Sequence, residues 1–495
     1  MCTLSIFPVF PSDGQIPLCE VDGRVQYSTP DFMNLHLFTM SVSDHPKVVL
    51  NKDVLHHSTL RVFAGQVFLP GSDSLVHRIQ DAWYENGAGQ VLQVLSERED
   101  LLVLVKVVAK YLLSAYTFFE KTIEYVSSSR HVDLSLEDSD KFNEPVVCMN
   151  WHPECSKLAL ATRDDTVTLF CASTSINPIL KAKSQRKITC VAWRPLTSGE
   201  LAVGCSEGVY VWNMDPTTFV TRPAFSSAIH LPFSYVTNLA WSPQGDILII
   251  CNSQTPWMLA WEIDTKRSVV LKKVGGGGVS FLSWSHDGSK LLAATNTKLL
   301  RVWDTSKWTC ENWWTAGGSV NCACWSQNGA TLLFTTNTEP YIYSLPSFSA
   351  VFTDKSKRPS AYMVADLTRV QLPSGYLVGG EVKGMAWDRS NRRLALIFKD
   401  SPLIAVFYTC LRPKLQIYPG FFIKGLVDEM PSFICFQNNF TDGANLTICW
   451  SNGRVQYFPM IFRDAQVTVR ANTTNFSTSV NSLNDYSYYY TNSPS

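Results

Sequence analysis

The sequence predicts an all-β fold, a closed β-propeller of seven blades, and three observations predict it. A six-residue phrase that begins with a β-branched residue and ends in Trp occurs six times, and a degenerate seventh copy ends at Phe436. A second aromatic residue follows each copy after 18 to 21 positions. Successive copies lie 41 to 62 residues apart, which matches or exceeds the period of about 40–45 residues expected of propeller repeats.

Each phrase is predicted to be the first strand of a blade. Its fourth and sixth residues are both apolar or aromatic and point to one face, because side chains alternate along a strand. Pro or Gly follows most copies within a few residues, as a tight hairpin turn requires. The copies are 146–151, 188–193, 236–241, 279–284, 320–325, 382–387 and, in degenerate form, 431–436.

The two aromatic positions of each unit are predicted to form the core between blades, because a small sheet can bury its faces only against its neighbours. Trp303-Asp304 is the literal Trp-Asp that ends the third strand of WD repeats, so the units are of the WD40 type. The predicted blade-core residues are Trp151, Trp193, Trp212, Trp241, Trp261, Trp284, Trp303, Trp325, Tyr343, Trp387, Phe407, Phe436 and Tyr457.

Three regions are expected along the chain. Residues 1–140 have a different character and are predicted to form a mainly helical extension, with two or three helices within 72–84 and 90–125. Residues 141–471 form the propeller, with an insertion between Leu345 and Gly380. Residues 472–495 are a short polar tail, expected to be disordered because they have little to bury. The strand that closes the ring is expected from 465–470 or from an N-terminal segment.

Charge and apolar content exclude several classes of protein. Lys+Arg and Asp+Glu are each 42, so the concentrated positive charge of nucleic-acid binding is missing and direct binding of nucleic acid is not expected. The 14 cysteines are scattered through apparent strands, as reduced thiols of an intracellular protein are. The apolar stretch 101–119 contains Lys106 and Lys110 near its middle, which favours a buried helix over a membrane span.

No motif in the sequence supports catalysis, a cofactor or a metal. Cys322 and Cys324 share one face of a strand, but no nearby His or Cys pair completes a metal site. The glycines of 275–278 precede a strand, so they have no helix N-terminus to aim at a phosphate. His152 occupies a turn position that Ser or Arg takes in other blades. The chain is therefore predicted to be a non-catalytic scaffold that binds proteins.

Several unusual phrases resemble one family. They include Asp215-Pro216-Thr217-Thr218, the segment 284–290 (WSHDGSK) and the segment 339–345 (EPYIYSL), and they are similar to the aladin family of WD-repeat nucleoporins. The resemblance implies a scaffold of the nuclear pore complex, held at the nuclear envelope by a transmembrane nucleoporin and in contact with other nucleoporins. It implies a role in nuclear protein import and, in dividing cells, at the spindle poles. Attachment to the membrane would then be indirect.

A second interpretation shares the same fold. A propeller of this kind also serves as a substrate receptor of a ubiquitin ligase or as a subunit of a vesicle coat. The residues that bind a partner are not indicated by the sequence.

Overall fold

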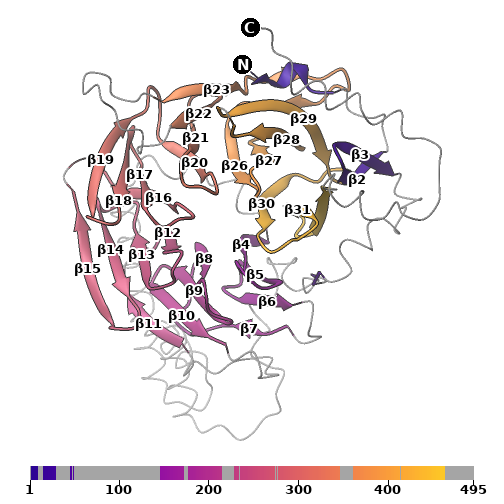
Figure 1. The fold of residues 1–495 in the computed structure, drawn as a ribbon. Helices are drawn as coiled ribbons and strands as arrows, with labels where there is room; N and C mark the ends of the chain where they lie inside the picture. Colours follow the sequence, from indigo (N-terminus) through magenta and orange to yellow (C-terminus); the bar gives the residue numbers. More distant parts are fainter. Residues whose placement is uncertain are drawn as a thin grey trace, which may run out of the picture.

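The computed structural model describes residues 2–8, 15–28, 45–46, 48, 145–171, 177–214, 228–233, 235–273, 275, 277–345, 361–412 and 414–462. These residues form seven sheets of four or five strands, arranged around a central axis, and one two-stranded ribbon (Figure 1). The predicted seven-bladed all-β propeller is confirmed. The helices expected within 72–84 and 90–125, the strand considered at 465–470 and the tail 472–495 lie outside the described residues, as do residues 346–360 of the insertion.

Blades 1 to 4 each use four consecutive strands. Blade 1 consists of β4 (Val146–Trp151), β5 (Lys157–Thr162), β6 (Val167–Cys171) and β7 (Ile179–Leu180). Blade 2 consists of β8 (Cys190–Trp193), β9 (Glu200–Cys205), β10 (Gly208–Asn213) and β11 (Ala228–Pro232). Blade 3 consists of β12 (Asn238–Trp241), β13 (Ile247–Cys251), β14 (Trp257–Glu262) and β15 (Arg267–Lys272). Blade 4 consists of β16 (Val279–Trp284), β17 (Lys290–Thr295), β18 (Leu299–Asp304) and β19 (Thr309–Trp314).

Blades 5 to 7 follow the same antiparallel order. Blade 5 consists of β20 (Val320–Trp325), β21 (Leu332–Thr336), β22 (Tyr341–Leu345) and β23 (Tyr362–Asp366). The ribbon of β24 (Val370–Gln371) and β25 (Leu377–Val378) leads to blade 6, which consists of β26 (Val382–Trp387), β27 (Arg393–Phe398), β28 (Leu403–Cys410) and β29 (Gln416–Lys424). Within the described part of the chain, blade 7 takes three strands from its own repeat, β30 (Pro431–Gln437), β31 (Gly443–Trp450) and β32 (Val455–Ile461).

The inner strands carry a recurrent irregularity. In β4, β16, β20, β26 and β30 the register with the second strand shifts between the first and the third residue of the strand. Such a bulge bends a strand and increases its right-handed twist. The six-residue phrase thus places a twisted strand on the channel side of these blades.

Segments from the start of the chain complete two blades. β2 (Ile16–Val21) runs parallel to β32, with Glu20 opposite Met460, and β3 (Arg24–Ser28) pairs with β2 as a fifth strand. β1 (Cys2–Thr3) runs parallel to β23 of blade 5. Of the two closures expected, the N-terminal segment is the one observed, and β30 lies against β4 to complete the ring (Figure 1).

These strands lie in a region expected to be a separate extension. Residues 2–8 and 16–28 instead belong to the sheets and core of the propeller. The physical reason is that blade 7 has three strands of its own among the described residues, so without a further strand β32 would leave a row of unpaired backbone groups at the edge of the sheet. β2 pairs with that edge.

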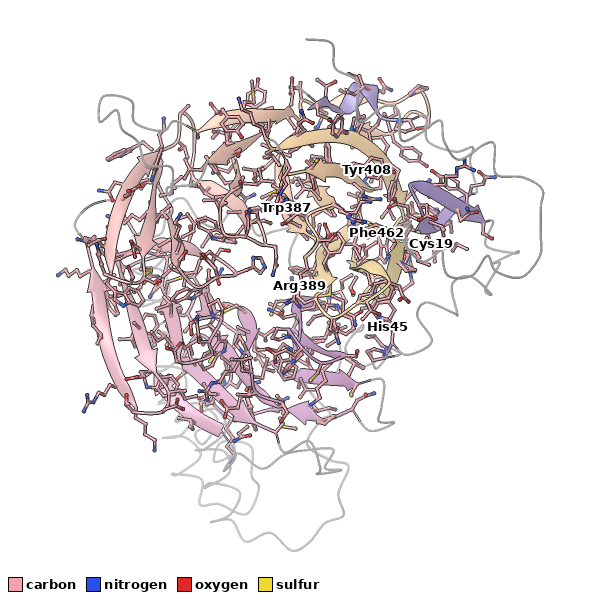
Figure 2. All side chains as sticks on the ribbon, viewed as in Figure 1. Cys19, His45, Trp387, Arg389, Tyr408 and Phe462 are labelled. Carbon is pink, nitrogen blue, oxygen red and sulfur yellow. The ribbon has the colours of Figure 1, made fainter. Side chains whose placement is uncertain are left out.

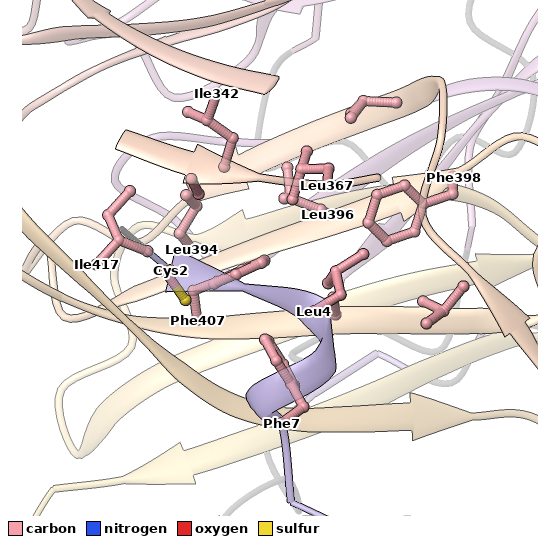
Figure 3. Packing of buried hydrophobic residues seen from close by; sticks show 14 of the residues in the cluster. Cys2, Leu4, Phe7, Ile342, Leu367, Leu394, Leu396, Phe398, Phe407 and Ile417 are labelled. Atoms are coloured by element: carbon pink, nitrogen blue, oxygen red, sulfur yellow. The ribbon is translucent and has the colours of Figure 1, made fainter. Parts of the chain in front are cut away.

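Side chains from neighbouring blades meet in shared hydrophobic clusters. The N-terminus joins the cluster of blades 5 and 6 through Leu4 of the 3₁₀ turn η1 (Leu4–Ile6) and through Phe7 (Figure 3). The Phe7 ring stacks on Phe422 at a centroid distance of 4.5 Å and meets the edge of Phe407 at 4.9 Å. Residues 2–8 therefore contribute to the core.

Candidate interaction surface

The thirteen predicted blade-core residues all lie between or within blades. Nine are buried: Trp151, Trp193, Trp212, Trp241, Trp261, Trp303, Trp325, Phe407 and Phe436. The other four are partly buried: Trp284, Tyr343, Trp387 and Tyr457. These side chains pack inside the propeller, so a partner protein must bind other residues.

The first-strand tryptophans also link successive blades by hydrogen bonds. In four pairs of blades, the indole Nε1 donates to the carbonyl oxygen of the residue that precedes the tryptophan of the blade before. The bonds run from Trp193 to Asn150, Trp241 to Ala192, Trp284 to Ala240 and Trp325 to Ser283, at 3.0 to 3.3 Å. Trp151 makes the corresponding link across the closure, to Thr447 Oγ1 of blade 7 at 2.8 Å.

Replacing a buried blade-core tryptophan should destabilise the ring strongly. The side chain of Trp303 is 3% exposed, so Trp303→Ala should lower the free energy of unfolding by about 3–5 kcal/mol. Trp314 lies in the next strand of the same blade and is 68% exposed, so Trp314→Ala should change it by less than about 0.5 kcal/mol. Urea unfolding followed by tryptophan fluorescence and circular dichroism measures both. Equal midpoints for the two variants would contradict the core position of Trp303.

The residue after the first-strand tryptophan closes the following turn. Ser285 Oγ accepts a hydrogen bond from the Lys290 backbone N–H at 2.9 Å. The His152 ring has the same role in blade 1. Its Nδ1 accepts hydrogen bonds from the backbone N–H groups of Glu154 and Cys155, both at 3.1 Å. The equivalent residues in blades 3, 5 and 6 are Ser242, Ser326 and Asp388, and all five side chains are at most 2% exposed. His152 is therefore a turn residue.

Protonation of His152 should weaken the fold. Burial lowers the pKa of the His152 imidazole below its ordinary value of 6.5. The unfolded chain therefore binds this proton more readily than the native one. Stability is complete above pH 6.5 and declines as the pH falls through that value, by up to about 1.4 kcal/mol per pH unit for one proton.

Thermal unfolding of the wild type and of His152→Ser, measured between about pH 7.5 and 5.5, tests this coupling. The variant retains a hydroxyl at the turn position, as in blades 3, 4 and 5. It should lose less stability on acidification than the wild type, while His286, whose pKa is also lowered by burial, contributes equally to both proteins. Parallel pH profiles would show that the proton on His152 is not coupled to folding.

The face on which first strands end and second strands begin is called here the turn face. On this face, between blades 6 and 7, the β2–β3 hairpin brings Glu20 against Arg393, the first residue of β27. The Arg393 guanidinium donates to both Glu20 carboxylate oxygens, with Nε at 2.9 Å from Oε2. Its carbon lies 4.3 Å from the Tyr408 ring centroid and 4.7 Å from that of Phe462 (Figure 2). Glu20 has no exposed area.

Two cavities open beside this ion pair. The first has a volume of about 690 Å³ and is lined by the hairpin residues 22–24 and by residues of β28 and β29. The second has a volume of about 400 Å³ and is lined mainly by the turns that follow β26 and β30. Arg392 lines both. We call the two cavities together the arginine groove.

The residues of this groove are not among those predicted from the sequence. The turn at the tip of the hairpin is visible in the sequence, because Asp-Gly favours a two-residue type I′ turn. Asp22 and Gly23 have the positive φ values that this turn requires, 48° and 82°. The run of arginines in 389–393 is also visible in the sequence. Nothing in the sequence shows that the two segments meet.

A third N-terminal piece lies on the turn face at the seam between blades 7 and 1. His45 Nε2 is 2.8 Å from Asn445 Nδ2, and the Tyr457 hydroxyl donates to the Pro46 carbonyl at 2.7 Å. Val48 packs against the cluster that contains Val146 of β4. The seam is therefore partly covered by the chain itself.

The residues considered for chemistry have structural surroundings. Cys322 and Cys324 lie within hydrogen-bonding distance of backbone carbonyls of β26, and burial raises the pKa of both thiols, that of Cys322 to about 12. No cluster of His, Cys, Asp or Glu suited to a metal occurs among the described residues. Within the same part of the chain, no helix has the length and apolar character needed to span a bilayer.

The fold and its repeats define a seven-bladed β-propeller of the WD-repeat type. A family model described as the Aladin seven-bladed propeller matches residues 134–461, more than half of the chain. The chain belongs to the Aladin seven-bladed propeller family. The strands that complete blades 5 and 7 from the N-terminus precede the matched residues.

Known proteins similar to this chain include two relatives and one solved structure. Aladin of Arabidopsis thaliana is 29% identical over 319 residues, which are 58% of this chain and 68% of that protein. Retinoblastoma-binding-like protein E of Dictyostelium discoideum is 38% identical over 71 residues, 14% of each chain. The β-propeller domain of Cps50 (Swd1) from Myceliophteria thermophila superposes with a TM-score of 0.48 at 15% identity, covering 63% of this chain and 96% of that domain.

Proposed function

We propose that this protein is a non-catalytic scaffold nucleoporin of the nuclear pore complex. The observation that carries the proposal is membership of the Aladin propeller family over residues 134–461. The structure supports a scaffold because its repeat residues are occupied by packing and by links between blades. Loops held on such a rigid frame can present a surface to a partner without rearranging.

The proposal includes the partners and the location. A transmembrane nucleoporin anchors the propeller at the nuclear envelope, where the protein contacts other nucleoporins and supports nuclear protein import. In mitosis the protein serves at the spindle poles. Its association with the membrane is indirect.

Fluorescent tagging of the full chain at its endogenous level tests the location. A punctate nuclear rim that coincides with a pore marker is the expected result. A purely cytosolic signal would instead favour the substrate receptor of a ubiquitin ligase, and a vesicular signal would favour a coat subunit. Either result would overturn the pore assignment.

Proximity labelling in intact cells tests the anchor, and the structure determines the design of the truncation. Removing residues 1–140 would also remove β1 and β2, which complete blades 5 and 7. We therefore replace only residues 49–144 with a flexible linker and keep residues 1–48. Labelling of a transmembrane nucleoporin by the full chain is expected, and loss of this labelling in the linker variant would assign the anchor contact to 49–144. If the full chain labels no transmembrane nucleoporin, the proposed anchoring is wrong.

A further inference from the structure

The arginine groove is an open feature of the described surface, and it contains more positive charge than its surroundings neutralise. We propose that the groove binds an extended acidic segment of a partner protein. The proposal goes beyond location at the pore. It rests on the proposed function only in that the occupant is a protein.

The groove consists of two adjacent cavities on the turn face of blades 6 and 7. Arg389 lines the cavity beside the turns, Arg24 lines the cavity beside the hairpin, and Arg392 lines both. Figure 2 shows Arg389 closer to the centre of the ring than Phe462. Because Arg392 lines both cavities, an extended segment that contacts Arg392 can reach into either one.

The three arginines are exposed, and none has an ion-pair partner among the described residues. Two nearby carboxylates already accept hydrogen bonds from other groups. Asp388 accepts hydrogen bonds from the backbone N–H groups of Arg392 and Arg393 at 2.7 and 2.6 Å. Glu20 is occupied by the Arg393 side chain. Asp22 is the one other carboxylate that lines the groove.

Several contacts hold the groove in a binding-competent shape. The Arg392 guanidinium carbon lies 5.3 Å from the Phe462 ring centroid, and the Tyr408 hydroxyl donates to the Gly23 carbonyl at 3.3 Å, which ties the hairpin to blade 6. Such preorganisation lowers the entropy that binding must remove.

The chemistry of these donors selects the occupant. Guanidinium groups present paired N–H donors that match the two oxygens of a carboxylate. The aromatic rings of Tyr408, Tyr418 and Phe462 give the walls apolar surface. An acidic segment with apolar residues between its carboxylates fits both properties.

Binding of defined peptides to the purified full chain tests the proposal. The probes are fluorescent twelve-residue peptides that carry two to six Asp or Glu at different spacings among Gly, Ser and Leu, each paired with a peptide in which Lys replaces every acid. At least one acidic peptide should bind, its Lys counterpart should not, and affinity should fall with added salt. Arg389→Glu with Arg392→Glu should weaken binding at least about tenfold.

The matched control reverses two exposed charges elsewhere. Arg267→Glu with Lys272→Glu alters β15 on the rim of blade 3, away from the groove, and should leave the affinity unchanged. Circular dichroism shows whether each double variant is folded. Failure of every acidic peptide, or equal loss in the groove and control variants, would overturn the proposal.

Truncation after residue 462 provides one more outcome. If peptides bind only after residues 463–495 are removed, the groove belongs to the tail of the chain itself and the proposal of a partner segment is wrong. Because these measurements use purified protein, a negative result leaves the nuclear-rim test unaffected, and a missing nuclear rim leaves peptide binding unaffected.

Discussion

Deletion of residues 2–28 is expected to abolish cooperative folding of the propeller. The deletion exposes the edge of β32 and removes buried side chains that include Leu4, Phe7 and Cys19. Each large apolar side chain contributes about 1.5–3 kcal/mol by burial, and the whole domain is expected to be stable by only about 5–15 kcal/mol. The truncated chain should therefore aggregate or unfold without a single transition.

Thermal unfolding and size-exclusion chromatography of three truncations measure this effect. Removal of 2–8 alone takes away β1 and the Phe7 contacts, whereas removal of 2–28 also opens blade 7. Removal of 463–495 is the control of similar length and should leave the unfolding midpoint unchanged. A synthetic peptide of residues 2–28 should restore a cooperative transition to the longer N-terminal deletion. A monomeric, cooperatively unfolding protein without residues 2–28 would show that β2 is not needed to close the ring.

Replacing the buried carboxylate of the closing strand should be as damaging as replacing a blade-core tryptophan. In Glu20→Ala, Arg393 retains its charge between two aromatic rings with no carboxylate to accept its hydrogen bonds. Breaking a buried ion pair on one side costs about 3–5 kcal/mol. The midpoint of urea unfolding should fall accordingly.

The double variant Glu20→Leu with Arg393→Met separates charge from packing. Apolar side chains in place of both partners of a buried pair are often neutral or stabilising, so the double variant should be clearly more stable than Glu20→Ala. If instead the two proteins unfold at the same denaturant concentration, the loss arises from packing and not from an unpaired charge.

Much of the blade structure could be predicted because its signal is local and repeated. The spacing between Trp284 and Trp303, and its equivalents in the other units, reflects strand lengths and turn lengths that lie within one stretch of sequence. The degenerate unit was located by the same spacing, and Phe436 lies in β30 with 8% of its surface exposed.

The closure and the groove could not be predicted because each depends on contacts between distant segments. Glu20 and Arg393 are 373 residues apart in the chain, and no pattern in either segment points to the other. The sequence shows three arginines in 389–393. In the fold, Glu20 pairs with Arg393 and neutralises it, whereas Arg389 and Arg392 have no such partner among the described residues.

The packing of Val48 gives the propeller a second covalent connection to residues 49–144. Val48 packs against the hydrophobic cluster at the seam of blades 7 and 1, and that cluster includes Val146. A partner bound within 49–144 would therefore be tethered to the ring through Val48 on one side and through β4 on the other. It would move less freely around the ring than a partner bound to an arm that is attached at one end.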